Sequence, residues 1–217
     1  MIKVLLVDDH ALMRAGLNRI LAERPDIEIV AEADSGEDAI MMAREHKPDV
    51  VLMDIQMPGI GGMEATRRML AHDDKLRIIA LSMYGDDPFP GRMLNAGAAG
   101  YLTKDCPADE IVNAIRKVHS GGNYVTPSVA GKLAVALATG KSDQPFTNLS
   151  QREMQVMLMV TNGSSIQEIS DTLNLSPKTV STYRYRLFEK LDVTNDVELT
   201  RMAMRHGLLD GGEADLK

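Results

Sequence analysis

The stretch Val50-Val51-Leu52-Met53-Asp54 (residues 50–54) is a short apolar run that ends directly on a carboxylate. Near the start of the chain, Ile2-Lys3-Val4-Leu5-Leu6-Val7-Asp8-Asp9 (residues 2–9) has the same form. Short apolar runs rich in branched side chains are typical of strands that are buried on both faces of a sheet. The pattern predicts two buried strands, at 2–7 and 50–53, each followed by acids.

Similar runs continue along the first half of the chain, and helical patterns separate them. Further strands are predicted at 27–33, 78–81 and 100–102. Helices are predicted at 11–22, 35–44, 61–71 and 110–119. Pro88 and Pro90 should shorten or delay the helix after the fourth strand. Because strands that alternate with helices build right-handed βαβ units, we expect a doubly wound α/β fold with five parallel strands.

The 217 residues are expected to form two domains joined by a linker. The first domain is predicted at 1–122. A linker with turn-forming residues follows at 123–146 and contains a helix at 126–139. A small all-helical domain is predicted at 147–209, and a flexible tail at 210–217.

The net charge of −7 is unevenly distributed between the two predicted domains. Residues 1–124 hold 14 basic and 20 acidic side chains, whereas residues 144–209 hold seven of each. A neutral domain can still bind nucleic acid if its cations gather on one face. The apolar runs are too short to span a membrane, no signal peptide is recognisable, and a single cysteine, Cys106, fits a reducing compartment. A cytoplasmic protein without a membrane partner is expected.

Five polar residues lie at or just after the ends of four predicted strands. The first and third strands of a doubly wound sheet are neighbours, so Asp8, Asp9 and Asp54 should converge at the carboxyl edge, where such sheets hold their active sites. Lys104 follows the fifth strand, and Ser82 ends the fourth. Clustered carboxylates need a cation, and Mg²⁺ prefers oxygen ligands beside a phosphate. Asp54 could then attack phosphorus as a nucleophile, while Lys104 neutralises the phosphoryl group.

These acids also have other interpretations. Aspartates at strand ends can simply cap the helices that follow them. The chain could instead be an enzyme, an aspartyl-phosphate phosphohydrolase on a similar sheet. Such an enzyme needs its nucleophile at the end of the first strand and an acid two residues later. His10 and Ala11 occupy those positions after Asp8 and Asp9, so an enzyme is not expected.

Four segments resemble the receiver domains of two-component response regulators. They are Leu5–His10, Val51–Gly59, Ala80–Ser82 and Gly97–Lys104. The resemblance implies the flavodoxin-like strand order 2-1-3-4-5. It also implies that a sensor histidine kinase phosphorylates Asp54. Many receivers have a proline directly after the lysine, whereas Asp105 follows Lys104 in this chain.

The same resemblance implies a role for each residue of the acidic cluster. Asp9, Asp54 and the Gln56 backbone carbonyl would bind Mg²⁺ directly, and Asp8 would bind it through water. Ser82 would hydrogen-bond the phosphate. Tyr101 would be the side chain that changes its burial when the domain switches.

The second domain has the pattern of a helix-turn-helix. Ser150 and Glu153 have the spacing of a capping box at the start of a first helix. A second helix is predicted at 165–173, and a tight turn follows at 174–176. Ser176 then caps a third helix, at 177–191, which has a proline at its favoured first position.

The third helix has a polar face that suits the major groove of DNA. Lys178, Ser181, Thr182 and Tyr185 lie three and four residues apart on a face without acids. Arg184, Arg186 and Lys190 flank this face. Cations bind phosphates, while hydroxyl and amphipathic side chains meet base edges. The alternative is an ordinary amphipathic helix with one solvated face.

Residues 149–209 resemble the DNA-binding domain of the LuxR/NarL/FixJ family. The matching residues are Leu149–Glu153, Gly163, Glu168-Ile169, Leu173, Leu175-Ser176, Lys178–Val180 and Lys190-Leu191. The resemblance implies base contacts from Ser181, Thr182 and Tyr185. It implies DNA-backbone contacts from Lys178, Thr179, Tyr183, Arg184, Arg186 and Lys190. Many members have a lysine at the position of Ser181, so a weaker salt dependence is expected here.

The last predicted helix, at 197–206, has two interpretations. In the family this helix is the dimer contact. Its apolar residues Leu199, Met202 and Ala203 could equally belong to the core of the domain.

Three segments are most similar to the GacA/UvrY/SirA subgroup of this family. They are Ser176–Val180, Thr182–Arg186 and Asp196–Thr200. The similarity implies a sensor kinase of the BarA/GacS type, double-stranded promoter DNA as the target, and a homodimer in the active state. A phosphorylation-dependent transcriptional regulator is therefore expected. The alternative is a receiver-type switch that acts through protein partners without binding DNA.

Overall fold

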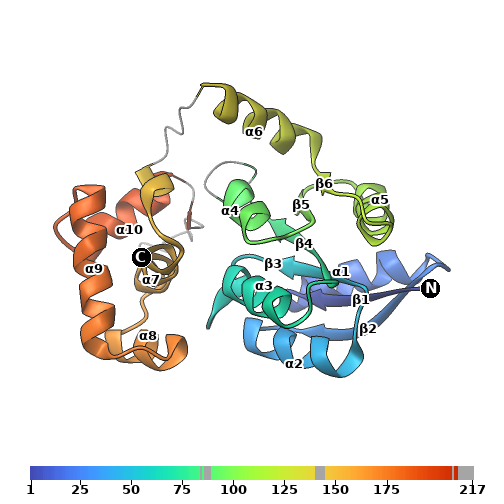
Figure 1. The fold of residues 1–217 in the computed structure, drawn as a ribbon, viewed down its shortest axis with the longest axis horizontal. Helices are drawn as coiled ribbons and strands as arrows, with labels where there is room; N and C mark the ends of the chain where they lie inside the picture. Colours follow the sequence, from blue (N-terminus) through green and yellow to red (C-terminus); the bar gives the residue numbers. More distant parts are fainter. Residues whose placement is uncertain (84, 86–88, 140–144, 207, 210–217) are drawn as a thin grey trace, which may run out of the picture. The chain divides into compact units, whose positions relative to one another are not determined.

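The computed structural model describes residues 1–83, 85, 89–139, 145–206 and 208–209 (Figure 1). The chain divides into two compact units, Met1–Lys141 and Ser142–Lys217, and each is described by itself. The predicted tail at 210–217 lies outside the described residues. Among the helices that are described, none is both long and apolar enough to cross a lipid bilayer.

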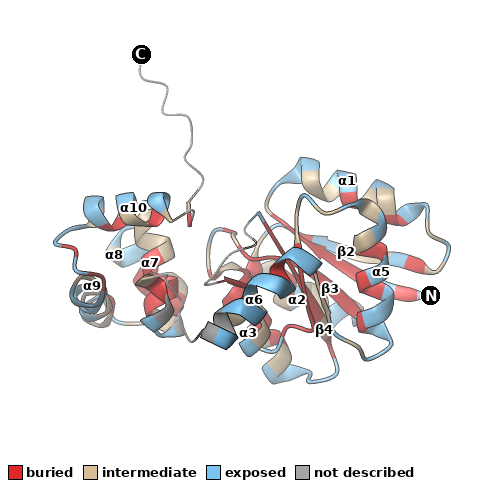
Figure 2. Cartoon of the chain, turned by 90° about the horizontal axis from the view of Figure 1, so that it is seen from above, coloured by how far each residue is buried: buried red, intermediate tan, exposed pale blue. Residues whose placement is uncertain are grey.

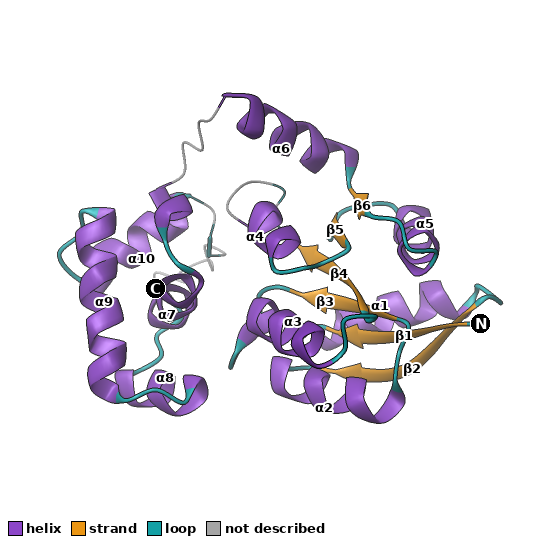
Figure 3. Cartoon of the chain, viewed as in Figure 1, coloured by secondary structure: helices purple, strands orange, loops and turns teal. Residues whose placement is uncertain are grey.

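The first unit is a parallel sheet with helices packed on its two faces (Figure 3). The strands are β1 (Ile2–Val7), β2 (Ile27–Ala33), β3 (Val50–Asp54), β4 (Arg77–Ser82), β5 (Gly100–Thr103) and β6 (Tyr124–Val125). The helices are α1 (Ala11–Ala22), α2 (Gly36–His46), α3 (Gly61–His72), α4 (Phe89–Asn95), α5 (Ala108–His119) and α6 (Pro127–Thr139). The strand order is β2-β1-β3-β4-β5-β6 with every pair parallel. The predicted doubly wound fold and the order of its first five strands are confirmed.

The sheet has one strand more than the five predicted. β6 pairs in parallel with β5, and the backbone N–H groups of Tyr124 and Thr126 donate to Ala99 and Tyr101, both at 3.0 Å. The sheet of the receiver unit therefore extends past residue 122, where the first domain was predicted to end. A strand of two residues has no periodicity that a sequence pattern could reveal, and only backbone pairing defines it.

Alternate residues of the strands supply two separate apolar layers. On β1, Val4 and Leu6 join the layer beneath α1 and α5, whereas Leu5 and Val7 join the layer beneath α2 and α3. Successive side chains of a strand point to opposite faces, so an unbroken apolar run must be covered twice. The buried residues lie along the strands and the inner faces of the helices (Figure 2).

Helix α4 is short, as the prolines near its start predict. It spans seven residues, Phe89–Asn95, and Pro90 lies in its first turn, where a missing N–H group costs no helical hydrogen bond. Phe89 and Met93 are fully buried and attach the helix to the rest of the unit. Pro88 lies outside the described residues.

The second unit is a bundle of helices with a helix-turn-helix at its centre. The helices are a short 3-10 turn η1 (Pro145–Asn148), α7 (Gln151–Thr161), α8 (Ile166–Leu173), α9 (Pro177–Leu191) and α10 (Asp196–Arg205). The predicted capping box of Ser150 and Glu153 is present, and a second one joins Ser165 and Glu168. Asn174 ends α8 in the left-handed conformation, and Ser176 then caps α9 by accepting a hydrogen bond from Thr179 N–H.

Helix α10 contributes both core and surface residues. Leu199 and Ala203 are fully buried within the described unit, so these two residues belong to its core. On the same helix, Val197 is 61% exposed and Met204 is 49% exposed. A dimer contact through α10 would therefore involve Val197 and Met204, and not Leu199 and Ala203.

Glu64 on α3 is a buried carboxylate that pairs with two partly exposed arginines. Glu64 is 2% exposed and accepts hydrogen bonds from Arg67 Nε at 2.9 Å and Arg68 Nε at 2.8 Å. Burial by itself raises the pKa of Glu64, but the two arginines outweigh it and lower the pKa from 4.5 to about 2. A carboxyl group whose pKa is lowered in the folded state stabilises that state only while it is ionised.

We expect Glu64→Gln to lower the free energy of unfolding at pH 7 by about 1–3 kcal/mol. The difference from the original chain should shrink as the pH falls from about 4.5 to about 2, because Glu64 itself becomes protonated there. Urea unfolding followed by circular dichroism measures the free energy of unfolding of the original chain and of the variant at each pH. Glu45→Gln, at an exposed position of α2, is the matched control and should change little. If the difference in the free energy of unfolding stays constant down to pH 2, the destabilisation comes from packing and not from the charge of Glu64.

Candidate functional site

The carboxyl edge of the sheet gathers the acids that the sequence singled out. β1 lies beside β3 with Val7 opposite Met53, so Asp8 and Asp9 leave the sheet next to Asp54. Asp8 is 1% exposed and Asp54 is 2% exposed. Asp8, Asp9, His10 and Asp54 each offer a ligand atom, and these atoms all lie within 4.8 Å of one another. The predicted convergence of the three aspartates is therefore present in the structure.

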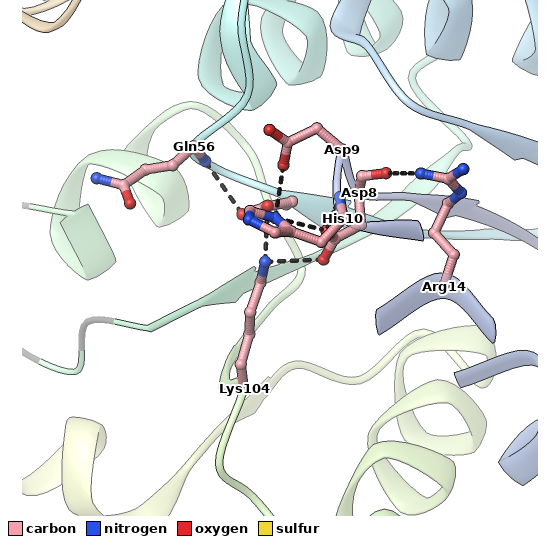
Figure 4. A network of polar contacts seen from close by, with 7 residues as sticks. Asp8, Asp9, His10, Arg14, Gln56 and Lys104 are labelled. Carbon is pink, nitrogen blue, oxygen red and sulfur yellow. Dashed lines mark hydrogen bonds and ion pairs between the residues drawn. The ribbon is translucent and has the colours of Figure 1, made fainter. Parts of the chain in front are cut away.

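Lys104 joins this cluster from β5 (Figure 4). Its Nζ lies 2.7 Å from Asp8 Oδ2 and 2.7 Å from Asp54 Oδ2. The backbone sets this position, because Lys104 N–H donates to the Ser82 carbonyl at 2.8 Å at the end of β4. One buried ammonium thus bridges two buried carboxylates.

Burial and the charge on Lys104 have opposite effects on the pKa of Asp54. Burial raises the pKa of Asp54 to about 6, although Lys104 lowers it through its charge and its hydrogen bond. Burial likewise opposes the charge on Lys104, but Asp54 and Asp8 outweigh this effect and raise the pKa of the ammonium. For Asp54, burial therefore outweighs the effect of Lys104 on the pKa. A second positive charge near Asp54 would favour the ionised carboxylate.

The residues present fit a hard divalent cation such as Mg²⁺. They provide carboxylate oxygens from Asp8, Asp9 and Asp54, and each residue offers an oxygen within 4.8 Å of the others. Mg²⁺ binds through one or two carboxylates and keeps several waters, so it suits a site of this composition. Asp9 and Asp54 could hold the ion directly.

Two other predicted site residues lie on the strands β4 and β5. Ser82 ends β4 and is 1% exposed, and Tyr101 on β5 is fully buried. The Gln56 N–H group donates to Asp54 Oδ1 at 3.1 Å, which orients the carboxylate. The role predicted for the Gln56 carbonyl, the phosphate contact of Ser82 and the switching of Tyr101 stay predictions.

Two further residues contact the cluster, and no spacing in the sequence singles them out. His10 Nδ1 lies 2.9 Å from Asp9 Oδ1 and 3.4 Å from Asp8 Oδ1. Arg14 Nη1 donates to the Asp8 carbonyl at 2.6 Å (Figure 4). The only sequence signal was proximity, because His10 follows the acids directly and Arg14 lies in the first turns of α1.

The loop after β3 approaches the phosphoacceptor candidate very closely. Gly62, in the first turn of α3, donates from its N–H group to the Ile55 carbonyl at 3.1 Å. A Cβ atom at this position would lie 1.8 Å from the Asp54 carbonyl oxygen. The absence of a side chain at Gly62 therefore lets α3 begin directly against the backbone of Asp54.

Helix α9 carries the residues predicted to bind DNA. Lys178, Thr182 and Arg186 are exposed, and Tyr185 is 67% exposed. Ser181 and Thr182 donate their hydroxyl groups to carbonyls one turn earlier on α9, at 3.0 and 2.9 Å. Val180, Leu187 and Leu191 are buried on the opposite side of the helix. The polar face is therefore exposed to solvent, and the DNA contacts of its residues stay predictions.

Two of the predicted DNA-backbone contacts have partners inside the second unit. Arg184 forms a bidentate ion pair with Asp196 at the start of α10, with 2.6 Å between Nε and Oδ1. Lys190 Nζ lies 2.7 Å from Glu153 Oε2 on α7. These pairs connect residues 12 and 37 positions apart, so the helical pattern of α9 alone could not reveal them. A DNA phosphate would have to compete with Asp196 and Glu153 for these two cations.

Comparisons with known proteins agree with both units. Residues 4–116 match the response regulator receiver domain, and residues 147–203 match the bacterial regulatory proteins of the luxR family. Response regulator GacA of Pseudomonas aeruginosa is 52% identical over 211 residues, covering 97% of this chain and 99% of GacA. Response regulator UvrY of Escherichia coli K12 is 51% identical over 209 residues, covering 96% of each chain.

A solved structure of similar organisation supports the same assignment. The crystal structure of response regulator ChrA, from a heme-sensing two-component system, is 33% identical with a TM-score of 0.54. The match covers 96% of this chain and 98% of ChrA. The chain therefore belongs to the two-component response regulators that join a receiver domain to a LuxR-type DNA-binding domain.

Proposed function

We propose that Asp54 accepts a phosphoryl group from a sensor histidine kinase and that the resulting aspartyl phosphate controls promoter binding by α9. The observation that carries the proposal is the buried cluster in which Lys104 lies 2.7 Å from the carboxylates of both Asp54 and Asp8. A nucleophilic carboxylate beside a fixed ammonium is what phosphoryl transfer needs, because positioning and charge neutralisation supply most of the rate.

Asp54 is the nucleophile of the proposed transfer step. An Oδ atom of Asp54 attacks phosphorus, the P–N bond to the histidine of the kinase breaks, and the imidazole leaves with its electron pair. Gln56 N–H and Lys104 hold the carboxylate in place beforehand. Bound Mg²⁺, held by Asp9 and Asp54, would neutralise the oxygens of the phosphoryl group. Lys104 would then exchange its contact with Asp54 for one with the phosphoryl group.

The coupling to the second unit follows from the added charge. An aspartyl phosphate carries about −1.5 to −2 charges, whereas the carboxylate that it replaces carries one, and Ser82 and Tyr101 would respond to the difference. Movement of these two residues would change the surface formed by α4, β5 and α5 and favour a homodimer. Coupling of this kind is typically about 1–3 kcal/mol, which corresponds to roughly 5–150-fold in DNA affinity.

We propose a kinase of the BarA/GacS type as the phosphodonor and a cytoplasmic location. The support is the 51–52% identity to GacA and UvrY across nearly the whole chain. The chain is proposed not to be an enzyme, because the acids are arranged to accept a phosphoryl group and not to act on a separate substrate.

A gel-shift titration on promoter DNA tests the proposed function. We expect treatment with acetyl phosphate and Mg²⁺ to tighten DNA binding by roughly 5–150-fold. Increasing salt should weaken the binding. The Asp54→Asn variant should bind DNA equally with and without phosphodonor. Absence of salt-sensitive DNA binding in both states would favour a switch that acts through protein partners.

Two substitutions on α9 should separate DNA-backbone contacts from base contacts. Lys178→Ala should weaken binding to all sequences alike and reduce the slope of log K against log salt by about 1. Tyr185→Ala should change the preference among promoter sequences instead. Both are measured by fluorescence anisotropy at several salt concentrations, with Arg19→Ala, an exposed cation on α1, as the control. The reverse pattern would refute the placement of α9 in the groove.

A further inference from the structure

Four side chains of the second unit form a continuous line of contacts from α10 to the polar face of α9. Arg184 donates from Nε to Asp196 Oδ1 at 2.6 Å and from Nη2 to Asp196 Oδ2, which makes the pair bidentate. The Cζ atom of Arg184 also lies 5.3 Å from the centre of the Phe188 ring. The Phe188 ring meets the Tyr185 ring at 87°, with 6.5 Å between the two centres. Arg184 therefore contacts an acid of α10 directly and is connected to Tyr185 through Phe188.

Asp196 has a well-defined position at the start of α10. Asn195 caps this helix by accepting a hydrogen bond from Glu198 N–H at 3.0 Å. Glu198 Oε2 in turn accepts from the Thr194 hydroxyl group at 2.8 Å. Leu199, in the next turn, is fully buried in the core of the unit. Because the start of α10 is held in this way, the Asp196 carboxylate can act as an anchor for Arg184.

The pairing occupies most of the binding capacity of Arg184. A planar guanidinium can form two parallel hydrogen bonds to a carboxylate and lie against an aromatic ring at the same time, which a lysine cannot do. The side chains of Arg184 and Asp196 are 31% and 41% exposed, so the pair is partly shielded from water. A DNA phosphate would bind Arg184 only by displacing Asp196.

Arg186, two residues later on α9, is in a different situation. Its side chain is exposed, and no hydrogen bond or ion pair joins it to the described residues of the chain. A phosphate could bind Arg186 without displacing a protein group. Arg184 and Arg186 are therefore a matched pair of cations on one helix, one with an internal partner and one without.

We propose that Arg184 is a positioning residue that orients the Tyr185 ring for base recognition and does not bind a DNA phosphate. The inference rests on the proposed function, because it assumes that α9 binds promoter DNA. Tyr185 is 67% exposed, and the edge-to-face contact with Phe188 restrains its ring. A ring that is ordered before binding loses less conformational freedom when it contacts a base. Sequence preference would then depend on Asp196, a residue of α10 outside the helix-turn-helix.

The first test compares Arg184→Ala with Arg186→Ala by fluorescence anisotropy at several salt concentrations. The probes are a duplex that the original chain selects from a random library and a scrambled duplex of the same composition. Arg184→Ala should lower the ratio of the two affinities by about two- to tenfold and leave the slope of log K against log salt unchanged. Arg186→Ala should lower that slope by about 1 and leave the ratio unchanged.

Two further variants separate the geometry of Arg184 from its charge. Arg184→Lys keeps the charge but cannot form the bidentate pair and cover the ring together, so it should lower the affinity ratio as Arg184→Ala does. Asp196→Asn should lower the ratio as well, and the double variant Arg184→Ala/Asp196→Asn should be no worse than Arg184→Ala alone. A slope that falls by about 1 in Arg184→Ala and is restored in Arg184→Lys would identify a phosphate contact and overturn the proposal.

Aromatic NMR spectra test the positioning without DNA. Asp196→Asn and Arg184→Lys should both shift the ring signals of Tyr185 and Phe188, because both break the bidentate pair. Arg19→Ala, at an exposed position of α1, should leave these signals unchanged. Circular dichroism establishes that all variants are folded. Unchanged Tyr185 signals in both variants would overturn this inference while leaving the proposed function intact, whereas failure of the original chain to bind any duplex would contradict both.

Discussion

Asp54→Asn should abolish stable labelling of the chain by radiolabelled acetyl phosphate in the presence of Mg²⁺. The amide of asparagine is a far weaker nucleophile than a carboxylate and cannot form an acyl phosphate. The replacement keeps the shape of the side chain, and its oxygen can still accept the hydrogen bond that Gln56 N–H now donates at 3.1 Å. The expected loss is therefore chemical. The label of the original chain should be released by hydroxylamine, as expected of an acyl phosphate.

The matched control for this variant is Asp34→Asn. Asp34 also follows a strand, because β2 ends at Ala33, but it is exposed and does not belong to the acidic cluster. It should be labelled as fully as the original chain. Equal labelling of the Asp54→Asn variant would sink the assignment of the phosphoacceptor. Thermal unfolding of both variants establishes that loss of label is not loss of fold.

Gly62→Ala should be among the most destabilising single substitutions in the first unit. The added Cβ would lie 1.8 Å from the Asp54 carbonyl oxygen and 2.8 Å from its carbonyl carbon. Backbone atoms cannot turn away as a flexible side chain would, so the start of α3 must shift. Overpacking of this kind costs about 1–3 kcal/mol and occasionally more. The shift also moves the loop beside Asp54, so the labelling rate should fall together with stability.

Gly16→Ala is the matched control, since it makes the same chemical change where space is open. Gly16 lies within α1, and no atom outside its own stretch of the helix lies within 4 Å of the position that a Cβ would take. Alanine restricts the unfolded chain more than glycine does, so this variant should be more stable by about 0.5–1 kcal/mol. Urea unfolding measures both variants. A destabilisation of Gly62→Ala no larger than a few tenths of a kcal/mol would show that the β3–α3 loop adapts.

Much of the fold was predictable from local sequence patterns. The apolar runs of β1 and β3 are covered on both faces, and Ser150, Ser165 and Ser176 cap helices through local hydrogen bonds. Each of these features depends on residues of a single helix or strand, or on residues a few positions from it in the sequence. β6 was missed because pairing with β5, and not its own pattern, makes it a strand.

The candidate site was predictable to a similar extent. Parallel strands bring their carboxyl ends to one edge, so the position of Asp8 and Asp54 follows from topology. The bridge from Lys104 to both carboxylates depends on distances across three strands, which no pattern contains. The pairing of Arg184 with Asp196 arises in the same way between α9 and α10.

The sequence by itself determined the order of the strands and helices, the helix-turn-helix and the identity of the acids at the strand ends. Periodicity, capping and turn residues act locally, so they can be read along the chain. The tertiary structure alone decided which charges are neutralised. It pairs Lys104 with two acids and Arg184 with one. The electrostatic partners of a side chain depend on distances between elements that lie far apart in sequence.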